Sequence, residues 1–187
     1  MALLVTGLVL FLGMHLVPAM PARRSALVAR FGERGYRGLF SAISGIGLVL
    51  IVAGFATAPR TRLFAPWPAA VAAAPVAMAI AMVLLAAANL RGHLRRALAH
   101  PMLLGTILWA GVHLLANGDL AGTVLLGGFL AWALVDLASA VAGGRIRSFE
   151  PRLAHDAISI AAGLAAFAAF AALHRVLFGP QVVPFGF

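Results

Sequence analysis

The sequence predicts an all-α membrane protein, a polytopic bundle of about six transmembrane helices that forms one domain over residues 1–187. Three observations predict this fold. The chain is 63% apolar and only 10% charged, its mean hydropathy is +1.03, and its long apolar stretches are separated by short arginine-rich loops. A soluble protein of 187 residues could not bury so many apolar side chains, so lipid is expected to cover most of the surface.

Hydropathy places six spans near residues 2–20, 38–57, 67–90, 102–116, 119–142 and 156–177. Most are close to the roughly 20 residues that cross about 30 Å of hydrocarbon. The first is expected to stay in the protein, with a cleaved signal peptide as the alternative, because no basic region follows Met1. The fourth is short enough to be re-entrant, but His100-Pro101 and Asn117-Gly118 supply a helix start and stop that favour a full span.

Arginine supplies all 14 basic residues, against 5 acidic ones, for a net charge of +9. The charges are spread over loops and form no soluble basic face, so no nucleic-acid partner is expected. With the N-terminus outside, the inner loops carry Arg23, Arg24, Arg30, Arg34, Arg37, Arg91, Arg95, Arg96, Arg145, Arg147 and Arg152, and the outer side carries Arg60, Arg62 and Arg175. This bias predicts a multi-pass protein of the bacterial inner membrane with both termini in the periplasm.

Four arginines of the first inner loop would share one face of a helix, within about 60° of one another at about 100° per residue. They are Arg23, Arg30, Arg34 and Arg37. Such a stripe is expected to anchor the protein to lipid headgroups, and a phosphate or a cofactor propionate is the other ligand that suits it. Gly32 and Gly35 argue against one continuous helix here.

Chemistry is expected at the few polar residues inside the spans, because such residues are costly to place in lipid. They are His15, Asn89, His113, Asn117, Asp136 and His174. Trp109 and Asn117 stand four residues before and after His113, so an indole and an amide flank this imidazole on one helical face and are expected beside a cofactor. Cysteine is absent, which makes His15 and His113 the natural pair for a buried haem iron.

The number of iron ligands stays open at this point. At about 1.5 Å per residue, His15 and His113 differ in membrane depth by roughly 8 to 10 Å, which helix tilt absorbs only in part. A single-histidine site with His113 as the proximal ligand is the alternative. His100 competes with His113, but the separation of 13 residues rotates it by about 220°, so both cannot face one centre from a straight helix.

The remaining polar residues receive structural interpretations. His100 is expected to cap a helix or contact a headgroup, and His174 is expected to anchor the outer end of the last span. No role is assigned to His93 or His155. For Asp136 two partners are weighed, an arginine of an inner loop and the N–H of a ligand histidine.

Several motifs resemble the NnrU family of bacterial membrane proteins. They are His15-Leu16-Val17-Pro18, the segment 32–41, the segment 99–105, and the spaced Trp109, His113, Asn117 and Gly118 that lead to Gly127-Gly128. The resemblance is strongest over residues 1–142. The family is associated with denitrification, and it is similar to zeta-carotene isomerase, a membrane enzyme that uses haem b to isomerise a cis double bond when the iron is reduced.

The resemblance implies a haem b site and matches its ligands by position. An early ligand histidine of the isomerase corresponds to His15, a second corresponds to His113 in its Trp-x-x-x-His pattern, and His100 matches a third histidine. We therefore expect a haem protein in contact with membrane lipid, with redox or isomerase-type activity on a lipophilic or small gaseous partner, in denitrification or in isoprenoid and carotenoid chemistry. The alternative is a non-catalytic membrane accessory protein or a small transporter.

Overall fold

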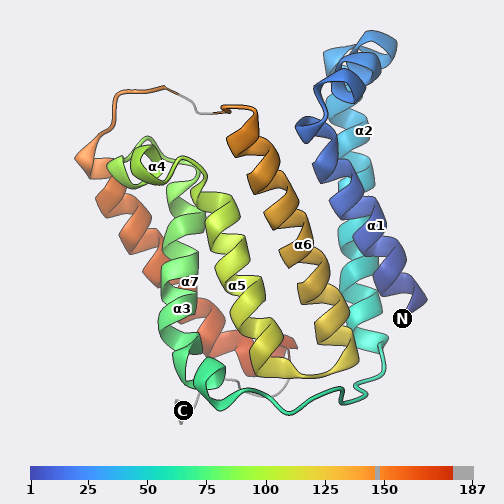
Figure 1. Ribbon diagram of the computed structural model, residues 1–187, viewed down its shortest axis with the longest axis vertical. Coiled ribbons are helices and arrows are strands. Elements are labelled where there is room, and N and C mark those ends of the chain that lie inside the picture. The colour runs from blue at the N-terminus through green and yellow to red at the C-terminus, as the bar shows by residue number, and fades with distance from the viewer. Residues whose placement is uncertain (146–147, 179–187) are drawn as a thin grey trace.

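Helices account for almost all of the structure, a computed structural model that describes residues 1–145 and 148–178 (Figure 1). They are α1 (Ala2–Leu16), the 3-10 helix η1 (Val17–Ala19), α2 (Pro21–Thr57), α3 (Pro68–Ala87), α4 (His93–Leu98), α5 (Pro101–Asn117), α6 (Leu120–Ala142) and α7 (Leu153–Phe178). Five helical segments are long and apolar enough to cross a membrane, and α5 is a shorter apolar helix. The prediction of an all-α, polytopic membrane fold is therefore confirmed.

The short helix α5 crosses the bundle and does not turn back within it. Its 17 residues rise about 25 Å at about 1.5 Å per residue. It packs between α3 and α6 and runs from one end of the bundle to the other (Figure 1). The re-entrant alternative is thus not the arrangement found.

The arginine-rich segment after the first span is helical, whereas the sequence predicted a loop there. The segment joins α2, and Gly32 interrupts the helix with φ 70° and ψ 165°, a conformation that glycine adopts without a Cβ clash. The predicted arginine stripe is therefore split, with Arg23 and Arg30 before the break and Arg34 and Arg37 after it. Hydropathy also missed the short polar helix α4, because an interfacial turn has no apolar run.

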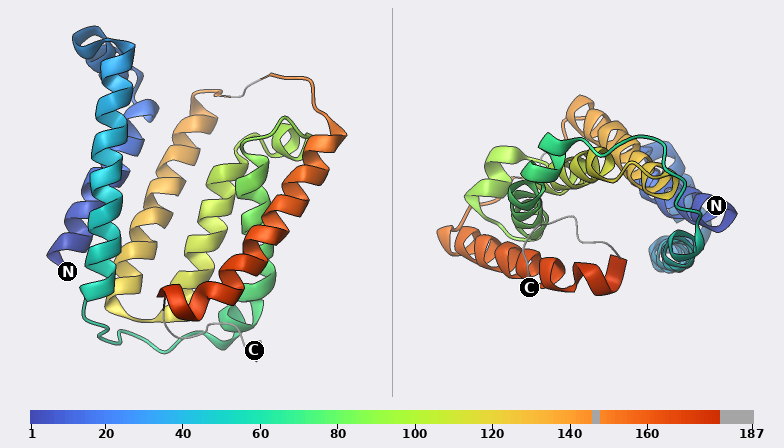
Figure 2. Two further views of the ribbon diagram at one scale, coloured as in Figure 1. Left: turned by 180° about the vertical axis from the view of Figure 1, so that it is seen from behind. Right: turned by 90° about the horizontal axis from the view of Figure 1, so that it is seen from below.

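The transmembrane helices of the bundle are arranged in a curved row. Along the row the order is α2, α1, α6, α5, α3, α7, each helix packing chiefly on its neighbours. Seen from below, the row bends so that α7 and α2 form its two ends (Figure 2). Within the described chain, neither α1 nor α7 packs its backbone directly on α5.

Glycines set the closest helix contacts in this row. A Cβ atom on Gly7 would lie 2.6 Å from the Ile51 nitrogen, one on Gly47 would lie 2.8 Å from the Phe11 nitrogen, and one on Gly163 would lie 2.6 Å from the Val83 nitrogen. These distances leave no room for a side chain, so backbones meet directly, as packing in lipid favours. Gly45, two residues before Gly47, faces open space.

The loops predicted to be internal all lie at one end of the molecule, which we call the arginine-rich end. It is formed by the ends of α1, α3 and α6 and by the starts of α2, α5 and α7 (Figure 1). The opposite end carries Arg60 and Arg62 in the α2–α3 connection. Arg147 lies outside the described residues. The strong asymmetry of charge between the two ends persists in three dimensions.

Candidate functional site

His113 lies on α5, one turn before the end of the helix, with its tautomer fixed by the chain itself. Its Nδ1–H donates to the carbonyl oxygen of Trp109 at 3.0 Å. A carbonyl can only accept, so the proton of the neutral ring is on Nδ1 and Nε2 keeps its lone pair. That is the state in which an imidazole can coordinate a metal.

The surroundings of His113 are aromatic and apolar. The indole of Trp109 lies 6.0 Å from the imidazole, centre to centre, and packs edge-on against Phe129 of α6 at 5.4 Å. Trp109 also packs against the buried cluster of Ala77, Met78 and Ala81 on α3. The indole is therefore beside His113 as the sequence predicted, held by α3 and α6.

Asn117 does not take the orienting position expected of it. Its amide Nδ2 lies beside Gly122, 3.3 Å from where a Cβ would stand on that glycine, at the turn into α6. The backbone carbonyl of Trp109 orients His113 instead. The four-residue spacing was correct, but helix α5 ends at Asn117, so the amide packs on the following turn.

His174 is the histidine that the structure brings to His113. The two rings lie 6.5 Å apart, centre to centre, with planes inclined by 27°. The sequence interpretation placed His174 at the membrane surface and missed this proximity. The sequence could have indicated this proximity. Helices α5 and α7 run in the same direction, and each histidine stands four residues before the end of its helix.

His15 occupies a separate aromatic environment toward the arginine-rich end. Its Nδ1–H donates to the Phe11 carbonyl at 2.7 Å, and its ring stacks on Phe11 at 4.2 Å. Phe40 of α2 and Trp132 of α6 lie 5.0 and 6.0 Å from it. Like His113, it is half-buried and keeps an Nε2 lone pair.

His15 and His113 do not meet in this arrangement. Helix α6 separates α1 from α5. Trp132, which marks the level of His15, is 12 residues from the start of α6, whereas His113 is four residues from the adjoining end of α5. The difference of about eight residues corresponds to about 12 Å along the bundle. Aromatic contacts from Phe11 through Phe129 to Trp109 connect the two environments.

Asp136 pairs with an arginine of an inner loop, one of the two partners predicted. Its Oδ1 accepts from Nη2 of Arg145 at 2.9 Å, and the same nitrogen donates to the Asp136 carbonyl at 3.2 Å. The Asp136 side chain is 16% exposed, so the ion pair compensates a mostly buried charge. The structural interpretation of this carboxylate is confirmed.

A second carboxylate, which sequence reasoning overlooked, joins α7 to the start of α4. Asp156 accepts from the backbone N–H groups of His93 and Leu94 at 2.9 and 3.0 Å, and from His93 Nδ1–H at 2.8 Å. His155 Nδ1 accepts from the Arg91 N–H at 3.1 Å. His93 and His155, which had no assigned role, thus fasten two segments about 60 residues apart.

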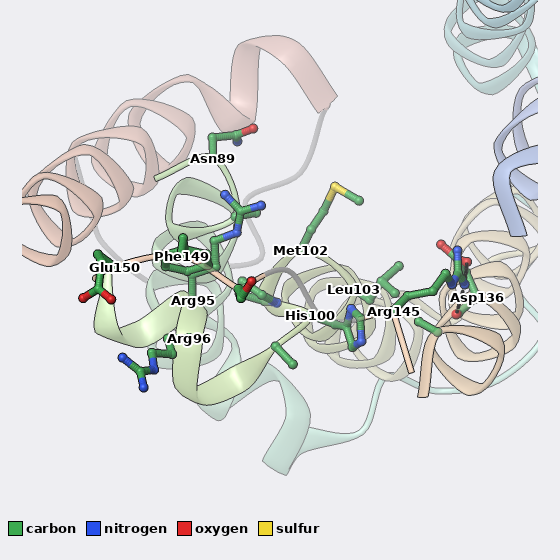
Figure 3. A pocket seen from close by; sticks show the side chains of 15 residues that line it. Asn89, Arg95, Arg96, His100, Met102, Leu103, Asp136, Arg145, Phe149 and Glu150 are labelled. Atoms are coloured by element: carbon green, nitrogen blue, oxygen red, sulfur yellow. Dashed lines mark hydrogen bonds and ion pairs between the residues drawn. The ribbon is translucent and has the colours of Figure 1, made fainter. Parts of the chain in front are cut away.

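A cavity of about 1100 Å³ opens at the arginine-rich end. Charged and polar side chains line it together with apolar ones, among them Arg95, Arg96, His100, Asp136, Arg145 and Phe149. Asp136 and Arg145 lie on one side, Arg95 and Phe149 on the other, and His100 between them (Figure 3). His100 is the N-cap residue of α5 but makes no side-chain cap hydrogen bond, so the cap expected from the sequence is absent.

His113 and His15 are single imidazole donors in separate environments. In the described residues, no three histidine or carboxylate side chains form a group that could hold a metal ion. Haem fits this donor set, because its porphyrin supplies four nitrogens and the protein adds one or two axial ligands. The fixed tautomers of His113 and His15 meet that requirement.

Comparison with known proteins identifies a family. No curated protein and no solved structure matches the chain. The model of the family described as NnrU protein matches residues 3–182, so the likeness extends beyond residue 142 and includes α7. Together with the apolar helices and their arginine-rich connections, this match shows that the chain is a multi-pass membrane protein belonging to the NnrU family.

Proposed function

We propose that this NnrU protein binds haem b and that His113 is an axial ligand of the iron. The observation that carries the proposal is the hydrogen bond from His113 Nδ1–H to the Trp109 carbonyl, which leaves Nε2 as a ligand. The aromatic surroundings support it, because Trp109 and Phe129 offer flat apolar surface to a macrocycle. The absence of cysteine leaves histidine as the strongest haem ligand in the chain.

The geometry favours His174 over His15 as the second axial ligand. A metal–imidazole bond is about 2 Å long, so two imidazoles on one iron place their nitrogens about 4 Å apart and their ring centres roughly 6 Å apart. The rings of His113 and His174 are separated by 6.5 Å in a stacked relation, so both rings would turn to direct their Nε2 atoms at a shared iron. His15, with its own fixed tautomer, would reach the same iron only if α1 moved along α6.

Haem, when bound, supplies one-electron redox chemistry or a Lewis-acidic iron. The protein would supply an apolar position in the membrane, where a lipophilic or small gaseous molecule can arrive from lipid. The proposed activity is therefore of the redox or isomerase type, in denitrification or in isoprenoid and carotenoid chemistry. The bacterial inner membrane, with both termini in the periplasm, is the proposed location because arginine gathers at one end.

An optical spectrum of the full-length protein, purified from cells supplied with haem precursor, tests the proposal. We expect a Soret band and sharp reduced bands in the wild type. His113→Ala should lose most of the bound haem while still inserting in the membrane, because insertion depends on the apolar spans. His100→Ala, at the opposite end of α5, is the matched control and should retain most of the haem. A colourless wild type would instead support an accessory protein or a small transporter, whereas equal haem content in His113→Ala would show that His113 is not the ligand.

A further inference from the structure

The cavity at the arginine-rich end lies far from the proposed haem site. His100, in its wall, is 13 residues from His113, which is about 20 Å along a helix. We propose that this cavity binds an anionic amphiphile, with a carboxylate or phosphate head at Arg95, Arg96 and His100 and a hydrocarbon body along the apolar wall. This site goes beyond the haem proposal and does not depend on it.

The charges around the cavity favour an anion. Arg145 is already paired with Asp136 at 2.9 Å, so that side is neutralised. On the other side Glu150 also lines the cavity (Figure 3), so Arg95 and Arg96 together exceed the acidic charge there by one. Arg96 and His100 have no side-chain hydrogen bond or ion pair in the described chain. Arg95 lies over the Phe149 ring at 5.4 Å, a contact that leaves the guanidinium edge able to donate.

The backbone adds donors at the same place. Helix α5 begins at Pro101, directly after His100, and no side chain caps it. The first N–H groups of a helix have no partner within the helix and attract negative charge. An anionic head at Arg96 and His100 would therefore also lie near these donors.

One part of the wall is apolar. Leu103 and Ala140, which are 4% and 3% exposed, form this part with Met102, Ala99 and the Phe149 ring, whereas Asn89, Ser148 and Glu150 add polar positions elsewhere in the lining. The volume of about 1100 Å³ is at the upper end of small-molecule sites, which span about 300–1,000 Å³. A bare phosphate would leave such a cavity nearly empty, whereas an acyl chain or an isoprenoid chain would fill its apolar part.

Native mass spectrometry of the full-length protein in uncharged detergent tests this site directly. The probes are oleate, dioleoyl phosphatidylglycerol, oleyl alcohol and inorganic phosphate. Oleyl alcohol has the chain without the charge, and phosphate has the charge without the chain. We expect saturable binding of oleate or phosphatidylglycerol at one equivalent and much weaker binding of the other two. Preference for oleate identifies a free carboxylate as the ligand, and preference for phosphatidylglycerol identifies a lipid headgroup.

Matched variants separate the cavity from the general basic surface. Arg95→Gln/Arg96→Gln should bind the anionic probe at least about tenfold more weakly, because charge-assisted hydrogen bonds are lost. Arg23→Gln/Arg34→Gln removes the same charge from exposed positions at the same end and should bind as the wild type does. Arg96→Gln alone changes an exposed residue without side-chain partners and should show a smaller loss of binding. This single variant keeps the test valid if the double variant does not fold.

Three results would overturn the proposal. Equal binding of oleyl alcohol and oleate would mean that the probe coats apolar surface. An equal loss in Arg23→Gln/Arg34→Gln would mean that any basic site suffices. Loss of haem from Arg95→Gln/Arg96→Gln, with haem retained in Arg23→Gln/Arg34→Gln, would mean that the cavity holds haem propionates. Failure of the haem proposal alone leaves these binding measurements unaffected, so the two ideas are tested separately.

Discussion

The imidazole rings of His113 and His174 lie 6.5 Å apart, although the helices that carry them do not pack on each other. Without a functional ligand, two histidines would have a lower free energy at the membrane surface, because placing each polar ring inside the bilayer is costly. Their approach from α5 and α7, with planes inclined by 27°, is therefore the geometry on which the choice of His174 as a proposed second ligand rests.

The identity of the second axial ligand can be read from two single variants. His174→Ala should yield a high-spin haem or lose haem, because it removes the imidazole nearest to His113. His15→Ala should keep the wild-type spectrum. Both proteins should be compared at equal yield by absorption and by electron paramagnetic resonance. The reverse result, with His15→Ala altered and His174→Ala normal, would restore the pair predicted from the sequence and require a different packing of α1.

The orientation in the membrane follows from the arginine-rich end. Fusions of a reporter after Arg37, Arg96 and Arg147 should be active as cytoplasmic reporters, and fusions after Arg62, Gly118 and Phe187 as periplasmic ones. Arg147 and Phe187 lie outside the described residues and test the same topology from the sequence alone. A cytoplasmic signal at Gly118 would show that α5 does not cross the membrane.

The ion pair of Asp136 and Arg145 should stabilise the fold without affecting the cofactor. Asp136→Asn should lower the free energy of unfolding by roughly 1–3 kcal/mol, because it removes the charged acceptor of a mostly buried hydrogen bond. Arg145→Gln should have a similar effect, and the double variant should be less destabilised than the sum of both, since the partners are removed together. Thermal melts and haem spectra measure the two properties. A shifted Soret band in Asp136→Asn at unchanged stability would contradict this role.

The contact of α1 with α2 predicts different outcomes for two neighbouring glycines. Gly47→Ala places a Cβ 2.8 Å from the Phe11 nitrogen and should destabilise the protein by about 1–3 kcal/mol through overpacking. Gly45→Ala meets open space and should be neutral or slightly stabilising, because alanine favours the helix. Melting temperatures of both variants in one detergent give the comparison. Equal destabilisation would mean that the helix pair is packed differently.

The spans could be predicted from the sequence because long stretches of high hydropathy mark segments that face lipid. The predicted ranges agree with α3, α5, α6 and α7 to within a few residues. The amino-terminal part of α2 and the short α4 were missed, since their charged turns lie beyond the apolar runs. Gly32 was recognised as an interruption because a mid-helix glycine is unfavourable.

The site was predicted only in part, for a reason of geometry. Helical spacing correctly placed Trp109 beside His113, since both belong to one helix. It carries no information on which helices are neighbours, so the choice between His15 and His174 could not be made from periodicity. For the same reason the role of Asp156 was not predicted, because its hydrogen-bond donors belong to a segment some 60 residues earlier.

Helix α3 has no titratable side chain between Pro68 and Ala87, yet both helices that carry His113 and His174 pack on it. It contacts α5 where Gly105 approaches the Ala81 carbonyl, and α7 where Gly163 approaches Val83. A change in how closely these backbones approach α3 would therefore be expected to change the separation of the two imidazoles. Substitutions on this chemically inert helix would tune a ligand's affinity or redox potential while touching neither histidine.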